Sequence, residues 1–253
     1  MRETATEDIL GYRIFSDERS RCLDSIADWV MHGDRPRWLA CINPHSDIVA
    51  LEDQAFSQAL HDADWLIPDG IGIVLASRIL GGSIRYRITG SDIFQGLNRH
   101  LDARGGYSCF FLGSTEDTLR QITVNMARDY PDIRIAGVHS PPFKAEFTPE
   151  DDATMVATIN AARPDVLWVG MTAPKQEKWV YRNKDRLNVK FIAAIGAAFD
   201  FYTGKIKRSP VLFQKLGLEW LPRLLQEPRR LWRRNFISNP KFISRVLRAR
   251  LIR

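Results

Sequence analysis

Short apolar runs alternate along the chain with segments in which apolar residues recur at helical spacing. Six runs are apolar at consecutive positions, as in strands covered on both faces of a sheet: 37–43, 64–68, 107–113, 132–138, 165–171 and 189–197. Helical periodicity predicts helices near 18–31, 50–61, 70–80, 90–103, 114–129, 148–162 and 174–187. This order of strands and helices predicts an α/β domain with a doubly wound, largely parallel sheet.

The pattern changes near residue 205. From Ser209 onward there is no strand pattern, and glycine and proline divide the remainder into two or three expected helices. From Lys205 onward the chain carries fourteen basic and two acidic residues, whereas the net charge of the whole chain is only +6. We therefore expect a core domain over residues 1–205 and a basic helical appendage over residues 206–253. Such an asymmetry indicates a tail that meets an anionic surface.

Composition excludes several classes of protein. The 253 residues contain no apolar run of the ~18–20 residues that a membrane-spanning helix needs. The first ten residues lack the basic and apolar regions of a signal peptide, so none is expected. Cys22, Cys41 and Cys109 are isolated and the five histidines do not cluster. A reducing, cytoplasmic setting without a structural metal is therefore expected.

Two predicted strands end in glycine just before a helix begins. Gly113 precedes Ser114 and Thr115, either of which can cap the following helix, and Gly170 precedes Thr172, a second candidate cap. Both turns present free backbone N–H groups at the carboxyl edge of the sheet, where α/β proteins bind ligands. Phosphate is the ligand that suits such groups, although an ordinary strand–helix turn has the same pattern.

Asp69 follows the second predicted strand at that same edge, between Pro68 and Gly70. It has two interpretations. The first is that it caps the helix that begins with Gly70. The second is that it acts as a general base, because a carboxylate beside apolar walls has a raised pKa.

Two further clusters have both a structural and a functional interpretation. The segment 85–92 combines Arg85 and Arg87 with a helix start, and the segment 42–48 places Asn43 and His45 directly after the first strand. Each can be a capped turn or a ligand-binding loop. The glycine fingerprints of P-loop and dinucleotide-binding proteins are absent, which argues against an enzyme that uses NAD or S-adenosylmethionine.

Taken together, these stretches resemble the WecG/TagA/CpsF family of bacterial glycosyltransferases, glycosyltransferase family 26. The resemblance extends over about residues 38–235. The matching motifs are NP at 43–44, ADWLIPDGIG at 63–72, RITGSD at 87–92, FLGS at 111–114, SPPF at 140–143, VGMTAPKQEKW at 169–179, IGAAFDFYTGKIKRSP at 195–210 and LGLEWLPRLLQEPRR at 216–230.

The resemblance implies a Rossmann-like fold with a helical C-terminal appendage. It implies an inverting transfer of a hexose-type sugar, N-acetylmannosamine or glucose, from a UDP-sugar to a sugar on a polyprenyl pyrophosphate. The reaction would take place at the inner face of the bacterial membrane and would serve teichoic acid, common antigen or exopolysaccharide synthesis. No cofactor or metal is expected. A homo-oligomer, in which rearrangement of the tail completes the active site, is also implied.

The resemblance also implies roles for individual residues. Asp69 would be the catalytic base, and Arg87 would balance the charge that develops on the leaving UDP. Gln176 and Asn43 would bind the donor. Arginines of the tail, Arg223, Arg229 and Arg230, would complete the site. Weaker candidates for the UDP site are Gly113, Ser114, Phe143, Gly170, Lys175, Phe199 and Asp200.

One position departs from the family pattern. Several relatives have threonine where this chain has Cys41, and a thiol is a poorer hydrogen-bond donor than a hydroxyl. Either the contact is dispensable or the donor sugar differs.

The appendage has three interpretations. Its apolar residues at helical spacing and its basic residues predict peripheral binding to anionic lipids of the inner leaflet. Alternatively, the apolar residues pack on the core or in a dimer. Binding to nucleic acid is a weaker alternative, because the aromatic residues lie at amphipathic spacing and not on a stacking platform. A family member that has lost its activity is disfavoured, because Asp69, Arg87 and Gln176 are all present.

Overall fold

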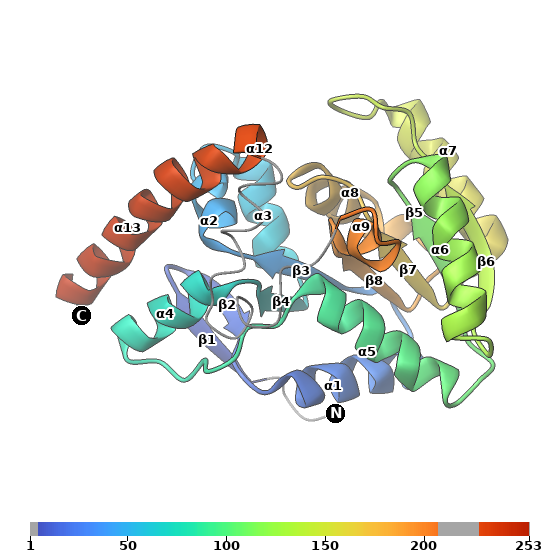
Figure 1. Cartoon of the computed structure of the whole chain (residues 1–253), viewed down its shortest axis with the longest axis horizontal. Helices are drawn as coiled ribbons and strands as arrows, with labels where there is room; N and C mark the ends of the chain where they lie inside the picture. The colour runs from blue at the N-terminus through green and yellow to red at the C-terminus, as the bar shows by residue number, and fades with distance from the viewer. Residues whose placement is uncertain (1–4, 207–227, 253) are drawn as a thin grey trace.

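The computed structural model of the chain describes residues 5–206 and 228–252. Its centre is a six-stranded parallel sheet with the strand order β4-β3-β8-β7-β5-β6 (Figure 1). The strands are β3 (Arg37–Ile42), β4 (Trp65–Pro68), β5 (Ser108–Leu112), β6 (Arg134–His139), β7 (Val166–Val169) and β8 (Phe191–Ala194). All six strands that the apolar runs predict are present, and the predicted α/β fold with a parallel sheet is confirmed.

Helices cover both faces of the sheet, which is why its strands are apolar at consecutive positions. One face packs against α1 (Arg19–His32), α5 (Gly90–Asp102), α6 (Glu116–Asp129) and α9 (Ala198–Tyr202). The opposite face packs against α2 (Pro44–Ala50), α3 (Gln54–Asp62), α4 (Ile71–Leu80), α7 (Pro149–Ala162) and α8 (Lys175–Asn183). The short 3-10 helix η1 (Lys184–Arg186) follows α8.

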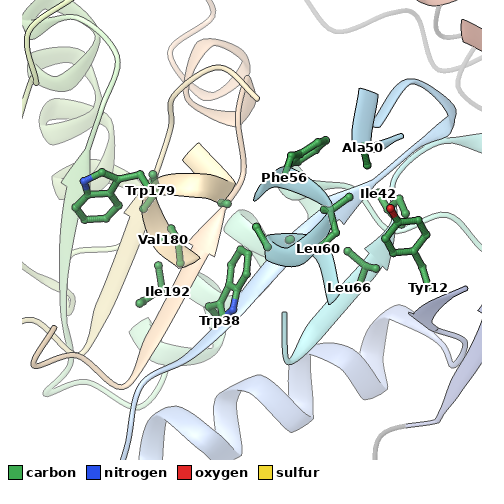
Figure 2. Close-up of a cluster of buried hydrophobic side chains, with 14 of the residues drawn as sticks. Tyr12, Trp38, Ile42, Ala50, Phe56, Leu60, Leu66, Trp179, Val180 and Ile192 are labelled. Atoms are coloured by element: carbon green, nitrogen blue, oxygen red, sulfur yellow. The ribbon is translucent and has the colours of Figure 1, made fainter. Parts of the chain in front are cut away.

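Alternate residues of each strand enter the two halves of the core. In β3, Trp38 and Ile42 belong to the half shown in Figure 2, whereas Leu39 points to the other. Trp38 is fully buried, and its indole Nε1 donates to Asp62 Oδ2 at 2.9 Å. Burial of one such large side chain contributes on the order of 3 kcal/mol, so strand β3 is anchored between both halves.

A two-stranded antiparallel hairpin, β1 (Thr6–Ile9) and β2 (Tyr12–Phe15), precedes the sheet and was not expected from the apolar pattern. Its two turn residues, Leu10 and Gly11, both have positive φ, which matches the right-handed twist of a tight hairpin. Glu7 of β1 accepts hydrogen bonds from the backbone N–H groups of Ser83 (2.6 Å) and Ile84 (3.1 Å). The hairpin therefore fixes the segment that leads to Arg87.

The C-terminal region consists of α12 (Pro228–Arg233), a π-helical turn η2 (Arg234–Ser238) and α13 (Asn239–Ile252). Helix α13 packs on α4 and α2 and extends along the edge of the molecule (Figure 1). Phe242 and Val246 of α13 are buried in the core. Of the alternatives for the appendage, packing of apolar residues on the core is thus observed for Phe242 and Val246 of α13. No helix within residues 5–206 and 228–252 is both long enough and apolar enough to cross a membrane.

Candidate active site

A cavity of about 810 Å³ lies at the carboxyl edge of the sheet. Its walls come from the segments that follow β3, β4, β5, β7 and β8, together with α4, α12, η2 and α13. From β3 the chain continues to β4 at one edge of the sheet, whereas β5 to β8 all lie on the other side of β3. The direction of the connections therefore reverses between the neighbouring strands β3 and β8. Ligands of open α/β sheets bind at this kind of reversal.

Asp69 lines the cavity directly after β4, and its backbone N–H donates to the Ile42 carbonyl at 2.8 Å. The N-cap residue of α4 is Gly70, at φ +107°, so Asp69 precedes the cap and lies two residues before the first residue of the helix. Gly72 is needed for a different reason, because a Cβ there would lie 2.3 Å from Pro44 Cγ. Gly70 thus lets α4 begin directly after β4, and Gly72 lets α4 approach α2. The half-buried Asp69 carboxylate remains at the cavity wall.

Asn43 is the N-cap of α2, and its Oδ1 accepts from the backbone N–H groups of His45 (3.0 Å) and Ser46 (3.1 Å). The expected Asx cap is therefore confirmed. Asn43 also lines the cavity, and its side-chain N–H₂ group is not used by the cap. The capping and ligand-binding interpretations are compatible, since they use different ends of one amide.

Arg87 lines the cavity just before α5 and is half-buried. The helix start after it is the expected N-cap: Thr89 and Asp92 form a capping box, with Asp92 Oδ2 accepting from the Thr89 N–H at 3.0 Å. Since this box fixes the first turn of α5, it also fixes where the chain delivers the Arg87 guanidinium.

The turn after β5 brings Ser114 to the cavity at a φ of +64°. Thr115 is the N-cap of α6, and its Oγ1 accepts from the Thr118 N–H at 3.3 Å, so the expected cap of α6 is present. Gly113 does not line the cavity. A Cβ at Gly113 would lie 2.7 Å from Met171 Cγ, so this glycine lets the β5 turn pack against the β7 turn.

The turn after β7 places Gly170 at the cavity with the ring of Phe199 directly beneath it. Phe199 is 1% exposed and belongs to the core, so it supports the floor and does not line the cavity. Thr172 does not cap α8. The N-cap is Pro174, and Thr172 contributes its carbonyl, which accepts from the Lys175 N–H at 3.0 Å.

Lys175 lines the cavity at the first position of α8, where a cation faces the positive helix end. Its Nζ donates to the Lys144 carbonyl at 2.9 Å and lies 4.5 Å from the centre of the Phe147 ring. Burial lowers its pKa. Lys175 therefore holds the loop that carries Phe143, whose ring is fully exposed beside the cavity mouth.

Gln176, in the first turn of α8, is 3% exposed and lines the cavity. Its Oε1 accepts from the backbone N–H groups of Met171 and Gly196, each at 3.1 Å, and its Nε2 donates to Glu177 Oε1 at 2.8 Å. The amide thus ties the turns after β7 and β8 together.

The remaining candidates are Asp200 and the three arginines of the tail. Asp200 lines it from α9. Arg229 and Arg230 belong to α12, and Arg223 lies outside the described residues. The C-terminal segment contributes residues that the sequence did not identify as part of the site: Leu231, Arg234, Asn235, Asn239, Phe242, Ile243 and Val246.

Glu177 is a further residue of the cavity that the sequence did not identify as part of the site. It is 2% exposed, it lines the cavity, and burial raises its pKa to about 7. Burial also raises the pKa of the Cys41 thiol, and the charges of Asp69 and Glu177 raise it further. Cys41 and both carboxylates line the same cavity. The signal that could have identified Glu177 is its position on the apolar side of an otherwise polar helix start.

The aspartates of the sequence Asp62-Ala63-Asp64 lie at the opposite edge of the sheet. Asp64 Oδ2 accepts from the Trp38 N–H at 3.0 Å, and Asp64 Oδ1 lies 3.4 Å from Arg37 Nε. Within the described parts of the chain, no three His, Cys, Asp or Glu side chains gather in a way that could hold a metal ion.

Comparison with known proteins connects this geometry to one enzyme family. A model of the glycosyl transferase WecG/TagA/CpsF family matches residues 7–253. The chain is 31% identical over 211 residues to an N-acetylglucosaminyldiphosphoundecaprenol N-acetyl-beta-D-mannosaminyltransferase of Bacillus spizizenii, covering 83% of the chain and 79% of that protein. It is 26% identical over 250 residues to the enzyme of the same name from Staphylococcus aureus, covering 98% of the chain and 94% of that protein.

Proposed function

Because the chain belongs to the WecG/TagA/CpsF family of glycosyl transferases, we propose that it moves N-acetylmannosamine from a UDP-sugar to a lipid-linked acceptor. The acceptor is N-acetylglucosamine on a polyprenyl diphosphate, which is the substrate class that the names of the relatives print. The names of these relatives also favour N-acetylmannosamine over glucose as the transferred sugar. The product would serve a bacterial cell-surface polymer.

The observation that carries this proposal is the position of Asp69. Its carboxylate lies at the wall of a cavity that also receives the turns after β5, β7 and β8. In the proposed reaction, Asp69 takes the proton of the acceptor hydroxyl as that oxygen attacks C1 of the donor sugar. The bond from C1 to the UDP oxygen breaks in the same step, so the anomeric centre inverts.

The departing UDP leaves with negative charge, which the protein must balance. Arg87 is the first candidate, because it lines the cavity on the segment that the capping box of α5 fixes. The N–H groups of the Ser114 turn and Arg234 of η2 lie at the same cavity. Preorganised charges of this kind contribute about 100- to 1000-fold to a rate.

Two exposed apolar stripes support a site next to a membrane. Each has residues at intervals of four along one helix, and the two helices pack side by side: Ile71, Leu75 and Ile79 on α4, and Ile243, Leu247 and Leu251 on α13. Four of these residues also line the cavity. We infer that this surface enters the inner leaflet, where a polyprenyl chain would be anchored.

Basic side chains around the stripes support the same inference. Arg78 of α4 and Lys241 and Arg248 of α13 are exposed. Each such residue contributes about 1 kcal/mol of attraction near an anionic leaflet. On this proposal, residues 1–205 form the catalytic domain, and the appendage 206–253 both docks to lipid and closes one wall of the active site.

The proposal is tested by incubating the full chain with UDP-N-acetylmannosamine and a polyprenyl-diphosphate-linked N-acetylglucosamine. We expect release of UDP that depends on the acceptor, and slower release with UDP-glucose. If UDP is released in an acceptor-dependent way only from UDP-glucose, the donor sugar is glucose and the proposed reaction class still holds. Release that is independent of the acceptor would contradict the proposed transfer.

A further inference from the structure

The first turn of α8 contains a buried pair of polar side chains, Gln176 and Glu177. Their exposed fractions are 3% and 2%, and both line the cavity. Buried polar groups cost stability unless each is hydrogen-bonded, so the bonds that this pair makes indicate what it is for.

Gln176 uses its carbonyl end as a clamp on the backbone. Oε1 accepts from the N–H of Met171, which follows β7, and from the N–H of Gly196, which follows β8. Both distances are 3.1 Å. Since β7 and β8 are neighbouring strands, one side chain sets the spacing of two turns that form the floor of the cavity.

Glu177 supports the orientation in which the carbonyl end of the Gln176 amide faces those turns. The carboxylate oxygen Oε1 accepts from Gln176 Nε2 at 2.8 Å. If the amide were reversed, its N–H₂ group would face two N–H donors and its oxygen would face a carboxylate oxygen. The two backbone donors and the acceptor that Glu177 provides therefore act together against the reversed orientation.

The second oxygen of Glu177 has no role in stabilising the fold. Oε2 is buried and lacks a hydrogen-bond partner among the described residues. An unpartnered buried oxygen costs about 1–3 kcal/mol, so an apolar residue at this position would favour folding. The presence of a carboxyl group here is better explained by the orientation of Gln176 than by stability.

We propose that Glu177 is a positioning residue for glycosyl transfer, which holds the Gln176 amide so that the turns after β7 and β8 accept the donor sugar-nucleotide. The expected effect on sugar transfer rests on the proposed function, whereas the expected orientation of the Gln176 amide does not. Gln176 Nε2 carries two hydrogens, and Glu177 uses one. The other has no partner in the described parts of the chain and is left for the donor.

Three variants separate positioning from folding. In Glu177→Leu the acceptor for Nε2 is lost. In Glu177→Gln the side-chain carbonyl can still accept from Nε2, so the orientation is retained without the acidic group. Asn183→Ala is the matched control, because Asn183 is a buried polar residue of the same helix whose Nδ2 donates to the Trp179 carbonyl at 3.1 Å, away from the cavity.

The first readout is kinetic. We expect Glu177→Leu to lower kcat/KM for the UDP-sugar by roughly 10- to 100-fold, since small displacements of a site have effects of this size. KM for the lipid acceptor should change by less than about threefold, and Glu177→Gln should restore most of the loss. Asn183→Ala should lower the thermal midpoint and leave the KM for the UDP-sugar unchanged.

The second readout does not depend on turnover. In full-length protein labelled with ¹⁵N-glutamine, the Gln176 side-chain N–H₂ signal should show one slowly exchanging proton in the wild type and in Glu177→Gln. That protection should be lost in Glu177→Leu. If the wild type fails to transfer sugar, the proposed function fails, while this signal still tests the orientation of the amide.

Two results would overturn the inference. If Glu177→Gln is as impaired as Glu177→Leu while the Gln176 signal is protected, the carboxyl group itself acts on substrate. If the Gln176 signal is the same in Glu177→Leu and the wild type, Glu177 does not set the orientation of the amide.

Discussion

Arg245 of α13 forms an ion pair with Asp47 of α2, with 3.1 Å between Nε and Oδ2. Arg245 Nη2 also donates to Asp47 Oδ1 at 3.4 Å. The Asp47 side chain is 2% exposed, and burial raises its pKa despite the opposing charge of Arg245. Because Asn43 caps α2, this pair joins the appendage to an element of the candidate active site.

Arg245→Ala should therefore loosen α13. The variant leaves Asp47 buried without its counter-ion, which we expect to lower the free energy of unfolding by about 2–3 kcal/mol. Urea denaturation of the full chain measures this change. Arg248→Ala is the matched control, because Arg248 is an exposed arginine of the same helix and should change stability by less than about 0.5 kcal/mol. Equal effects of both substitutions would exclude a special role of the pair.

The two apolar stripes on α4 and α13 predict binding to anionic lipid. The double substitution Ile243→Asp and Leu247→Asp should weaken flotation with phosphatidylglycerol vesicles by at least about tenfold, since each apolar side chain contributes about 1.5–3 kcal/mol when buried. Val124→Asp is the control, because Val124 is 60% exposed but lies on α6.

Two outcomes of the vesicle experiment would count against a membrane-binding surface. One is unchanged flotation of the double variant. The other is steeply salt-dependent binding of the wild type to DNA with none to vesicles, which would favour the nucleic-acid alternative.

Glu177 predicts a dependence of stability on pH. Burial raises the pKa of Glu177 from its ordinary value of 4.5 to about 7, so between these pH values the folded state binds a proton that the unfolded state has released. The free energy of unfolding should therefore fall as pH rises from about 4.5 to about 7, by up to about 3 kcal/mol from this group.

The measurement is urea denaturation of the wild type and of Glu177→Gln at pH 5 and pH 8. Other groups titrate equally in both proteins, so the difference between the two pH profiles isolates Glu177. We expect a smaller fall for the variant. Parallel profiles would show that Glu177 ionises normally.

The sheet could be predicted from the sequence because its strands are covered on both faces, and six apolar runs mark them directly. The hairpin β1–β2 could not, because its strands have only four residues each and its turn is Leu10-Gly11 instead of a typical hairpin pair. Helix α2 was also not predicted, because its seven residues are too few for a clear helical period.

The candidate site could be predicted where a residue directly follows a strand, as Asp69 and Asn43 do. Sequence alone could not reveal that Phe199 lies beneath Gly170, since their contact depends on how β7 and β8 pair. The sequence also could not identify Arg234 or Asn235, because they line the cavity through the packing of η2 and α13 on α2 and α4.

The role of Asp69 as general base is tested most directly by acceptor-dependent UDP release from Asp69→Asn. Asn keeps the shape of the side chain but cannot take a proton, so kcat should fall by about 100- to 10,000-fold while UDP binding is retained. Asp117→Asn, at a surface carboxylate of α6 with 84% side-chain exposure, should be as active as the wild type. Equal rates for Asp69→Asn and the wild type would contradict the assignment of Asp69 as the base.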